Sequence, residues 1–224
     1  MLVIAAALPC AVLRGQDATE NSEPAVSVVA LPAHTTTQYY DPANPDPAMP
    51  PLESKEAGVT VSKYSCQAQV GGEVVQQTPQ DNRVMAVVRV DQVKITLGLD
   101  VAEWVAATAP PKTLAHEDGH RIVSEHFYMH AEIPAQQIGQ AIIGKEFSAV
   151  GADAQTAANL ALNQAATQVA QEYMAQVRDP SEQVQEAYDR ITEHGTNTID
   201  ELAAIDQALD ESAKKIAASA PPGN

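Results

Sequence analysis

The sequence predicts an α+β protein in which a small antiparallel sheet is followed by a helical C-terminal half. Residues 58–99 alternate apolar with polar side chains or are rich in β-branched residues, which is typical of strands. From Lys112 almost to the end the pattern is helical and rich in alanine. Aromatic residues make up only 4% of the chain, which favours thin, closely packed helices. Strands that precede helices indicate the α+β class.

The first residues form an apolar run that ends at Arg14. A run of about a dozen residues is too short to cross a bilayer and is typical of a secretory signal peptide. We therefore expect residues 1–15 to be a signal peptide, with a buried N-terminal strand as the alternative. The mature protein is then secreted or periplasmic and has no integral membrane segment. Removal of Cys10 would leave Cys66 alone, which excludes an internal disulfide and a cysteine-based zinc cluster.

The net charge of −16 argues against nucleic acid or an anionic membrane surface as a partner. Binding to phosphates needs clustered lysine and arginine, which this chain lacks. Residues 16–58 are rich in proline, serine, threonine and alanine, and prolines disfavour both helix and central strand. We expect this segment to be an extended, disordered linker that precedes one domain at 59–219, with 220–224 as a tail.

Two or three antiparallel strands are expected first in the domain. Residues 58–70 are followed by a turn signal at Gly71-Gly72, and the short polar pair Asp91-Gln92 separates two β-branched runs. Residues 101–111, which carry Trp104, predict a short helix or loop.

Helices fill the rest of the chain. The first is expected over 113–132, and the second begins near Pro134, a plausible first-turn proline. Asp153 is a good N-cap for a long alanine-rich helix, which Asp179-Pro180 breaks. The next helix ends at Gly195. A capping box at Thr198–Glu201 starts the last one, which runs to about Ala218.

The first of these helices contains the stretch LAHEDGH, in which His116 and His120 frame Glu117 in the pattern H-E-x-x-H. On a helix the two histidines lie within about 40° of each other. Val123 and Phe127 share this stripe, whereas the charged side chains Asp118, Arg121 and Glu125 fall on the opposite face. The histidines should therefore point inward.

This arrangement suits zinc chemistry. Two imidazoles one turn apart can bind the same tetrahedral ion, and the adjacent glutamate can accept a proton from a metal-activated water. We therefore expect Zn²⁺ at His116 and His120, with Glu117 as the general base. The alternative is a chance occurrence of a pattern with three fixed positions.

A catalytic zinc needs a third protein ligand. His126 and His130 lie too far along an unbroken helix to reach the same ion. His194 is a better candidate, although a histidine beside Gly195 is equally typical of a helix C-terminus. The glutamates Glu172, Glu186 and Glu193 remain alternatives.

The two motifs H-E-D-G-H and Y-D-R-I-T-E-H-G (Tyr188 to Gly195) together resemble DUF922, a bacterial family of predicted secreted zinc-dependent proteases. The resemblance covers about residues 59–197. It implies a zincin-like fold with His194 as the third ligand. Tyr188 is a candidate to hydrogen-bond the oxyanion of the tetrahedral intermediate, with a half-buried packing tyrosine as an equal alternative. Asp189 could orient a ligand histidine, but a surface charge is the simpler interpretation.

The sequence thus predicts a secreted zinc metallopeptidase that hydrolyses a peptide or protein substrate. One alternative is a non-catalytic extracytoplasmic helical binding module, which a structural zinc could stabilise. Another is a zinc hydrolase that acts on a different carbonyl substrate.

Overall fold

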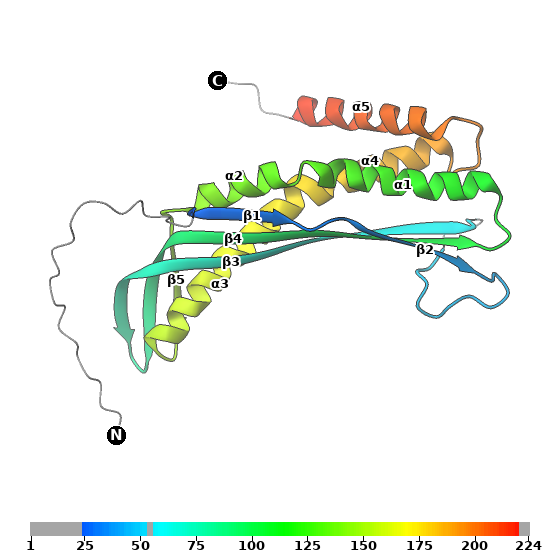
Figure 1. Ribbon diagram of the computed structural model, residues 1–224. Helices are drawn as coiled ribbons and strands as arrows, with labels where there is room; N and C mark the ends of the chain where they lie inside the picture. The colour runs from blue at the N-terminus through cyan, green and yellow to red at the C-terminus, as the bar shows by residue number, and fades with distance from the viewer. Residues whose placement is uncertain (1–23, 53–55, 220–224) are drawn as a thin grey trace, which may run out of the picture.

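The computed structural model describes residues 24–52 and 56–219. These residues form a five-stranded sheet with the helices packed on one of its faces (Figure 1). The predicted signal peptide, residues 1–15, and the predicted tail, residues 220–224, lie outside the described residues.

Two long strands organise the sheet. β3 (Gly58–Gln80) and β4 (Arg83–Ala106) pair antiparallel along their whole length and are joined by the two-residue turn Asp81-Asn82. The expected turn at Gly71-Gly72 is instead continuous strand opposite a bulge in β4, because Gly71 pairs with Gln92 and Gly72 with Val90, which makes Asp91 the extra residue. A Cβ on Gly72 would lie 2.5 Å from the carbonyl oxygen of Arg89, so the close approach of the two backbones requires glycine here. Residues 101–106 continue β4 and are neither helix nor loop.

Three short strands line the other edge of β4. β5 (Glu146–Gly151) pairs antiparallel, but β1 (Val26–Ala30) and β2 (His34–Tyr40) both pair parallel with β4. The predicted zincin-like architecture, α+β with a small antiparallel sheet, was therefore wrong, because the sheet is mixed and its two main strands have 23 and 24 residues.

The parallel strands come from the segment expected to be a linker. Pro32 lies between β1 and β2, and most other prolines of the segment follow Tyr40. The proline content averaged over 16–58 therefore concealed two short runs that are rich in β-branched residues, and the interpretation as disordered linker does not hold for 26–40.

The helices largely follow the expected boundaries, but β5 interrupts the half expected to be helical, and Asp200 caps the last helix where a capping box from Thr198 was expected. They are α1 (Pro111–Met129), α2 (Glu132–Ile142), α3 (Ala154–Tyr173), α4 (Asp179–Thr192) and α5 (Glu201–Ser219). The Asp153 side chain accepts a hydrogen bond from the Thr156 amide, which confirms the expected N-cap. Instead of the predicted break at Asp179-Pro180, one π-helical turn, η1 (Met174–Arg178), joins α3 to α4. No helix in the described ranges is long and apolar enough to cross a membrane.

Packing places α1 between the sheet and α4. Apolar side chains of β4 such as Leu97 and Leu99 form the main core with α2 and α3. On the other side of α1, Val123 packs with Val184 and Tyr188 of α4 and with Ala204 of α5. The inward face of α1 is thereby held against α4.

Candidate metal centre

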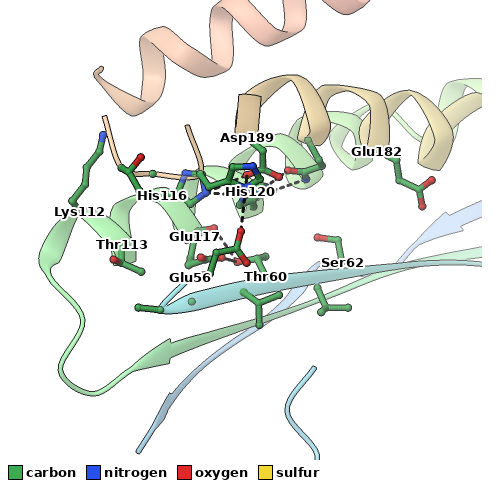
Figure 2. A pocket seen from close by; sticks show the side chains of 18 of the residues that line it. Glu56, Thr60, Ser62, Lys112, Thr113, His116, Glu117, His120, Glu182 and Asp189 are labelled. Atoms are coloured by element: carbon green, nitrogen blue, oxygen red, sulfur yellow. Dashed lines mark hydrogen bonds and ion pairs between the residues drawn. The ribbon is translucent and has the colours of Figure 1, made fainter. Parts of the chain in front are cut away.

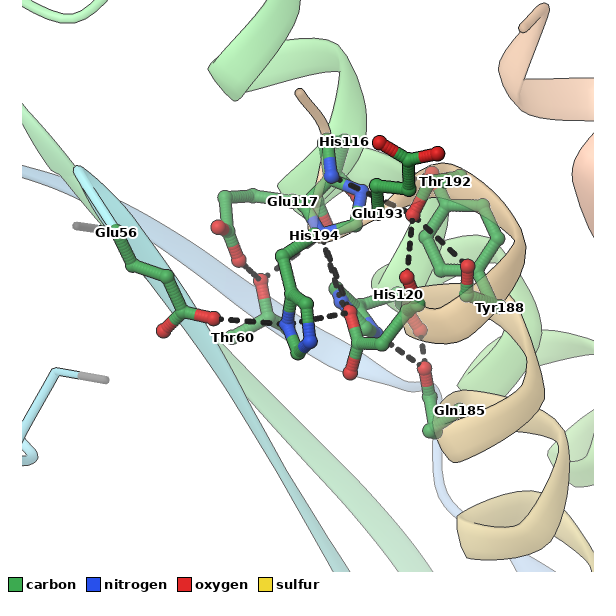
Figure 3. Close-up of polar contacts among 12 residues, drawn as sticks. Glu56, Thr60, His116, Glu117, His120, Gln185, Tyr188, Thr192, Glu193 and His194 are labelled. Atoms are coloured by element: carbon green, nitrogen blue, oxygen red, sulfur yellow. Dashed lines mark hydrogen bonds and ion pairs between the residues drawn. The ribbon is translucent and has the colours of Figure 1, made fainter. Parts of the chain in front are cut away.

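Three side chains from two helices converge where α1 faces α4. His116 and His120 come from α1, and Asp189 comes from α4 (Figures 2 and 3). The Oδ1 atom of Asp189 lies 3.2 Å from His116 Nε2 and 3.0 Å from His120 Nε2. The two Nε2 atoms are 3.3 Å apart. The i, i+4 spacing of the histidines on α1 therefore produces the predicted pair.

These distances fit one zinc ion. Ligand atoms roughly 2.0–2.1 Å from zinc in a tetrahedral arrangement lie about 3.3 Å from one another. The three atoms form a triangle with sides of 3.0, 3.2 and 3.3 Å. Two imidazole nitrogens and one carboxylate oxygen are also a usual donor set for a zinc site with an open fourth position. The residues present thus fit the metal that the sequence predicted.

Electrostatics holds the three groups together. Burial alone would raise the pKa of Asp189, but hydrogen bonds to His116 and His120 and their charge outweigh it and keep this pKa well below its usual range. Burial likewise opposes the charged form of His120, yet contact with Asp189 raises its pKa. A carboxylate held ionised beside two imidazoles is ready to bind a cation.

Gln185 orients His120. Its side-chain Nε2 donates to the His120 carbonyl and to Ser124 Oγ, both at 2.9 Å. The amide oxygen must therefore be the atom that faces His120 Nδ1 at 2.5 Å, so Nδ1 carries the proton. In the neutral ring this leaves a lone pair on Nε2, the atom that points at Asp189.

Glu117 lies beside the two histidines and is 4% exposed. The Thr60 hydroxyl of β3 donates to Glu117 Oε2 at 2.8 Å. Burial raises the pKa of Glu117, and the neighbouring His120 and the Thr60 hydroxyl only partly offset this. A Cβ on Gly58 would lie 2.6 Å from the same carboxylate, so glycine leaves room for it under α1.

His194 lies at the rim of the site. It follows α4 in a turn whose residues Glu193, His194 and Gly195 all have positive φ. Its Nδ1 atom is 3.0 Å from Glu56 Oε1 and 4.0 Å from Asp189 Oδ1 (Figure 3). The side chain is 48% exposed, and the group that converges contains Asp189 in its place. The assignment of His194 as the third ligand remains a prediction, and the geometry favours Asp189.

Tyr188, predicted to act on the oxyanion, lies behind the ligands. Its ring stacks on the His116 ring with centroids 5.0 Å apart. The hydroxyl lies 2.5 Å from Glu201 Oε2 and 3.3 Å from the His116 carbonyl oxygen. Burial, followed by the contact with Glu201, raises the pKa of Tyr188. The fully buried ring supports His116 from the side away from the pocket.

The other candidates of the sequence lie apart from the three convergent residues. Glu172 of α3 accepts a hydrogen bond from Gln168 one turn earlier. Glu186 and Glu193 line a second hollow on the far side of Asp189. His126 and His130 are exposed toward the other end of α1.

Gln185 and Thr60 were missed as parts of the site, and Asp189 was considered only as a residue that could orient a ligand histidine. Gln185 and Asp189 are four residues apart on a predicted helix, so they share a face. This spacing is the sequence feature from which the two α4 residues could have been identified as parts of one site. No local pattern marks Thr60, which reaches Glu117 only through tertiary packing.

A pocket of about 820 Å³ opens in front of the three ligands (Figure 2). Its walls are the first residues of β3, the first half of α1, the start of α4 and the turn after α4. His116, Glu117, His120, Asp189 and His194 all line it. A substrate in this pocket would contact the metal ligands and the buried carboxylate together.

Gly119 gives a prediction about the architecture of the site. A Cβ at this position would lie 2.1 Å from the Tyr188 hydroxyl oxygen, which the helix cannot accommodate without moving Tyr188 or α1. We expect Gly119→Ala to lower the free energy of unfolding by about 1–3 kcal/mol despite alanine's better helix propensity. Chemical denaturation monitored by circular dichroism measures this. Gly144→Ala is not a suitable control, because Gly144 has a positive φ. The double variant Gly119→Ala/Tyr188→Phe, which lacks the clashing hydroxyl, should recover part of the lost stability. An alanine variant as stable as the parent contradicts the packing.

Comparison of the chain with family models, curated proteins and solved structures gave no match. The site therefore rests on its own geometry.

Proposed function

We propose that the protein is a zinc-dependent hydrolase that cleaves peptide bonds, with His116, His120 and Asp189 as metal ligands and Glu117 as the general base. The observation that carries this proposal is the triangle of ligand atoms, with sides of 3.0, 3.2 and 3.3 Å, beside a buried carboxylate in an open pocket. A structural zinc site is usually closed by a fourth protein ligand, whereas this one faces a cavity.

When zinc is bound, it supplies Lewis-acid polarisation of a carbonyl and lowers the pKa of water. The protein's own groups then have separate tasks. Glu117 accepts the proton of the attacking water, and its raised pKa brings it closer to the range in which a base is efficient near neutral pH. Thr60 holds one carboxylate oxygen, which leaves the other for proton transfer. Gln185 fixes His120, and Tyr188 supports His116.

The edge of β3 supports a polypeptide substrate. The Ala106 amide donates to the Ala57 carbonyl, so by the alternation of an antiparallel pair the backbone groups of Gly58, Thr60 and Ser62 point away from β4. No described strand pairs with β3 on that side. An extended peptide can add to such an edge by main-chain hydrogen bonds. The same residues line the pocket, so the added strand would pass the metal centre.

Metal removal tests the function. We expect the purified protein to cleave an unfolded polypeptide such as casein, to lose this activity on dialysis against a zinc chelator, and to recover it with one equivalent of Zn²⁺. Release of peptides is followed by mass spectrometry and bound zinc by elemental analysis. Zinc binding without cleavage would favour the alternative of a binding module with a structural metal.

A further inference from the structure

Among the described residues around the metal centre, carboxylates outnumber the cations that are not already paired. Glu182 lines the pocket, and Glu186 and Glu193 line the hollow on the other side of Asp189. The cations of the same walls are already paired with carboxylates: Lys112 with Glu201 at 2.6 Å, Arg178 with Asp179 at 2.7 Å, and Arg190 with Glu211. The surroundings of the centre are therefore net negative, in a chain whose total charge is −16.

At the α4 end of the pocket, β3 presents a hydrogen-bond acceptor. Ser124 Oγ donates to the His120 carbonyl at 3.0 Å and accepts from Gln185. Ser62 Oγ lies 2.6 Å from Ser124 Oγ, a contact in which either hydroxyl can be the donor. In both arrangements the Ser62 oxygen keeps at least one lone pair that can accept a hydrogen bond from a group in the pocket.

Glu182 lies on the opposite wall at this end of the pocket (Figure 2). Tyr64 of β3 reaches Ser181 of α4 at 2.9 Å, which brings the residue after Ser181 close to the strand. Glu182 is 63% exposed, and its Oε1 is 3.4 Å from Arg178 Nε. Because Arg178 also binds Asp179, the three charges sum to −1. A substrate side chain that lies between Ser62 and Glu182 would therefore face hydrogen-bond acceptors and a net negative charge.

We propose that Ser62 and Glu182 form a subsite for a lysine or arginine side chain next to the scissile bond. The substrate class is thus a polypeptide that carries basic residues at its cleavage sites. This inference rests on the proposed peptidase function, since the subsite belongs to the same pocket. A donor-rich cationic side chain satisfies the acceptors, whereas an acidic side chain is repelled, and the negative surroundings also speed the approach of a cationic peptide.

Two sets of three peptides test the subsite. Within a set the peptides differ at one position, which is lysine, norleucine or glutamate. This position lies before the cleaved bond in the first set and after it in the second. We expect kcat/KM for lysine to exceed that for norleucine by about two- to five-fold in one set, and glutamate to be the poorest, because an ion pair with the largely exposed Glu182 contributes modestly. Glu182→Gln should shrink the lysine advantage, and 0.5 M salt should do the same.

Glu73→Gln is the matched control, because it removes the same charge eleven residues further along β3 than Ser62, on the order of 35 Å away. Binding of the lysine and norleucine peptides to Glu117→Gln protein, measured by fluorescence anisotropy, gives a readout independent of turnover. Cleavage of all peptides at equal rates, or an unchanged preference in Glu182→Gln, overturns the subsite alone. If no peptide is cleaved by the zinc-loaded protein, the peptidase function itself fails.

Discussion

Replacing Asp189 by alanine is expected to lower the affinity for zinc by about two orders of magnitude, whereas replacing His194 by alanine should lower it less than ten-fold. A four-ligand zinc site is stabilised by roughly 10–16 kcal/mol, so each ligand contributes on the order of 3 kcal/mol. Asp189 Oδ1 lies within 3.2 Å of both histidine Nε2 atoms, while His194 is half exposed and its Nδ1 faces Glu56 at 3.0 Å. The geometry therefore assigns the larger loss to Asp189.

Competition with a fluorescent zinc chelator measures the two affinities under the same conditions. Glu186→Ala serves as the control, because it removes a carboxylate from the same helix three residues before Asp189, on the wall of the second hollow. Thermal melts of the metal-free variants show whether each is folded. The opposite result, a large loss for His194→Ala and a small one for Asp189→Ala, would restore the ligand set that the sequence resemblance implies.

The sequence was informative about α1 because the relevant pattern is local. The stripe of His116, His120, Val123 and Phe127 repeats at helical spacing, and the structure places these side chains toward α4 and the core. Asp189 was harder to identify, because its role depends on where α4 lies against α1. A carboxylate on an isolated helix has the same local pattern whether it faces solvent or a metal site.

The sheet, too, could be predicted only where the sequence pattern is local. The alternation in 58–70 correctly indicated a strand, but the parallel pairing of β1 and β2 with β4 joins residues more than sixty positions apart. Local propensity indicates that a segment is extended and leaves its partner and direction undetermined. The sequence also failed to predict that β4 is one long strand. Asp91-Gln92 interrupts the apolar alternation, and the structure keeps this pair within β4 through a bulge in which Asp91 is the extra residue opposite Gly71-Gly72.

Glu117→Gln is expected to reduce peptide hydrolysis by about 10²- to 10⁴-fold with no change in bound zinc. Glutamine has nearly the same shape, and its side-chain oxygen can still accept the hydrogen bond from Thr60, so the fold around the centre should be kept. The amide has no basic oxygen to take a proton from water. Because Glu117 is not among the three convergent ligand atoms, its loss should leave the metal in place.

Turnover of a fluorogenic peptide and zinc content per chain measure the two effects on one preparation. Glu125→Gln is the matched control on the same helix, since that carboxylate pairs with Arg121 on the outer face of α1. It should retain parental activity. The proposal requires Glu117→Gln to lose activity while it keeps its zinc. If the variant loses zinc together with activity, Glu117 is a metal ligand. If it keeps full activity, Glu117 has no part in the reaction. Separation of the effects follows from the structure, because the carboxylate is held by β3 beside the ligands and is buried where only the pocket gives access to it.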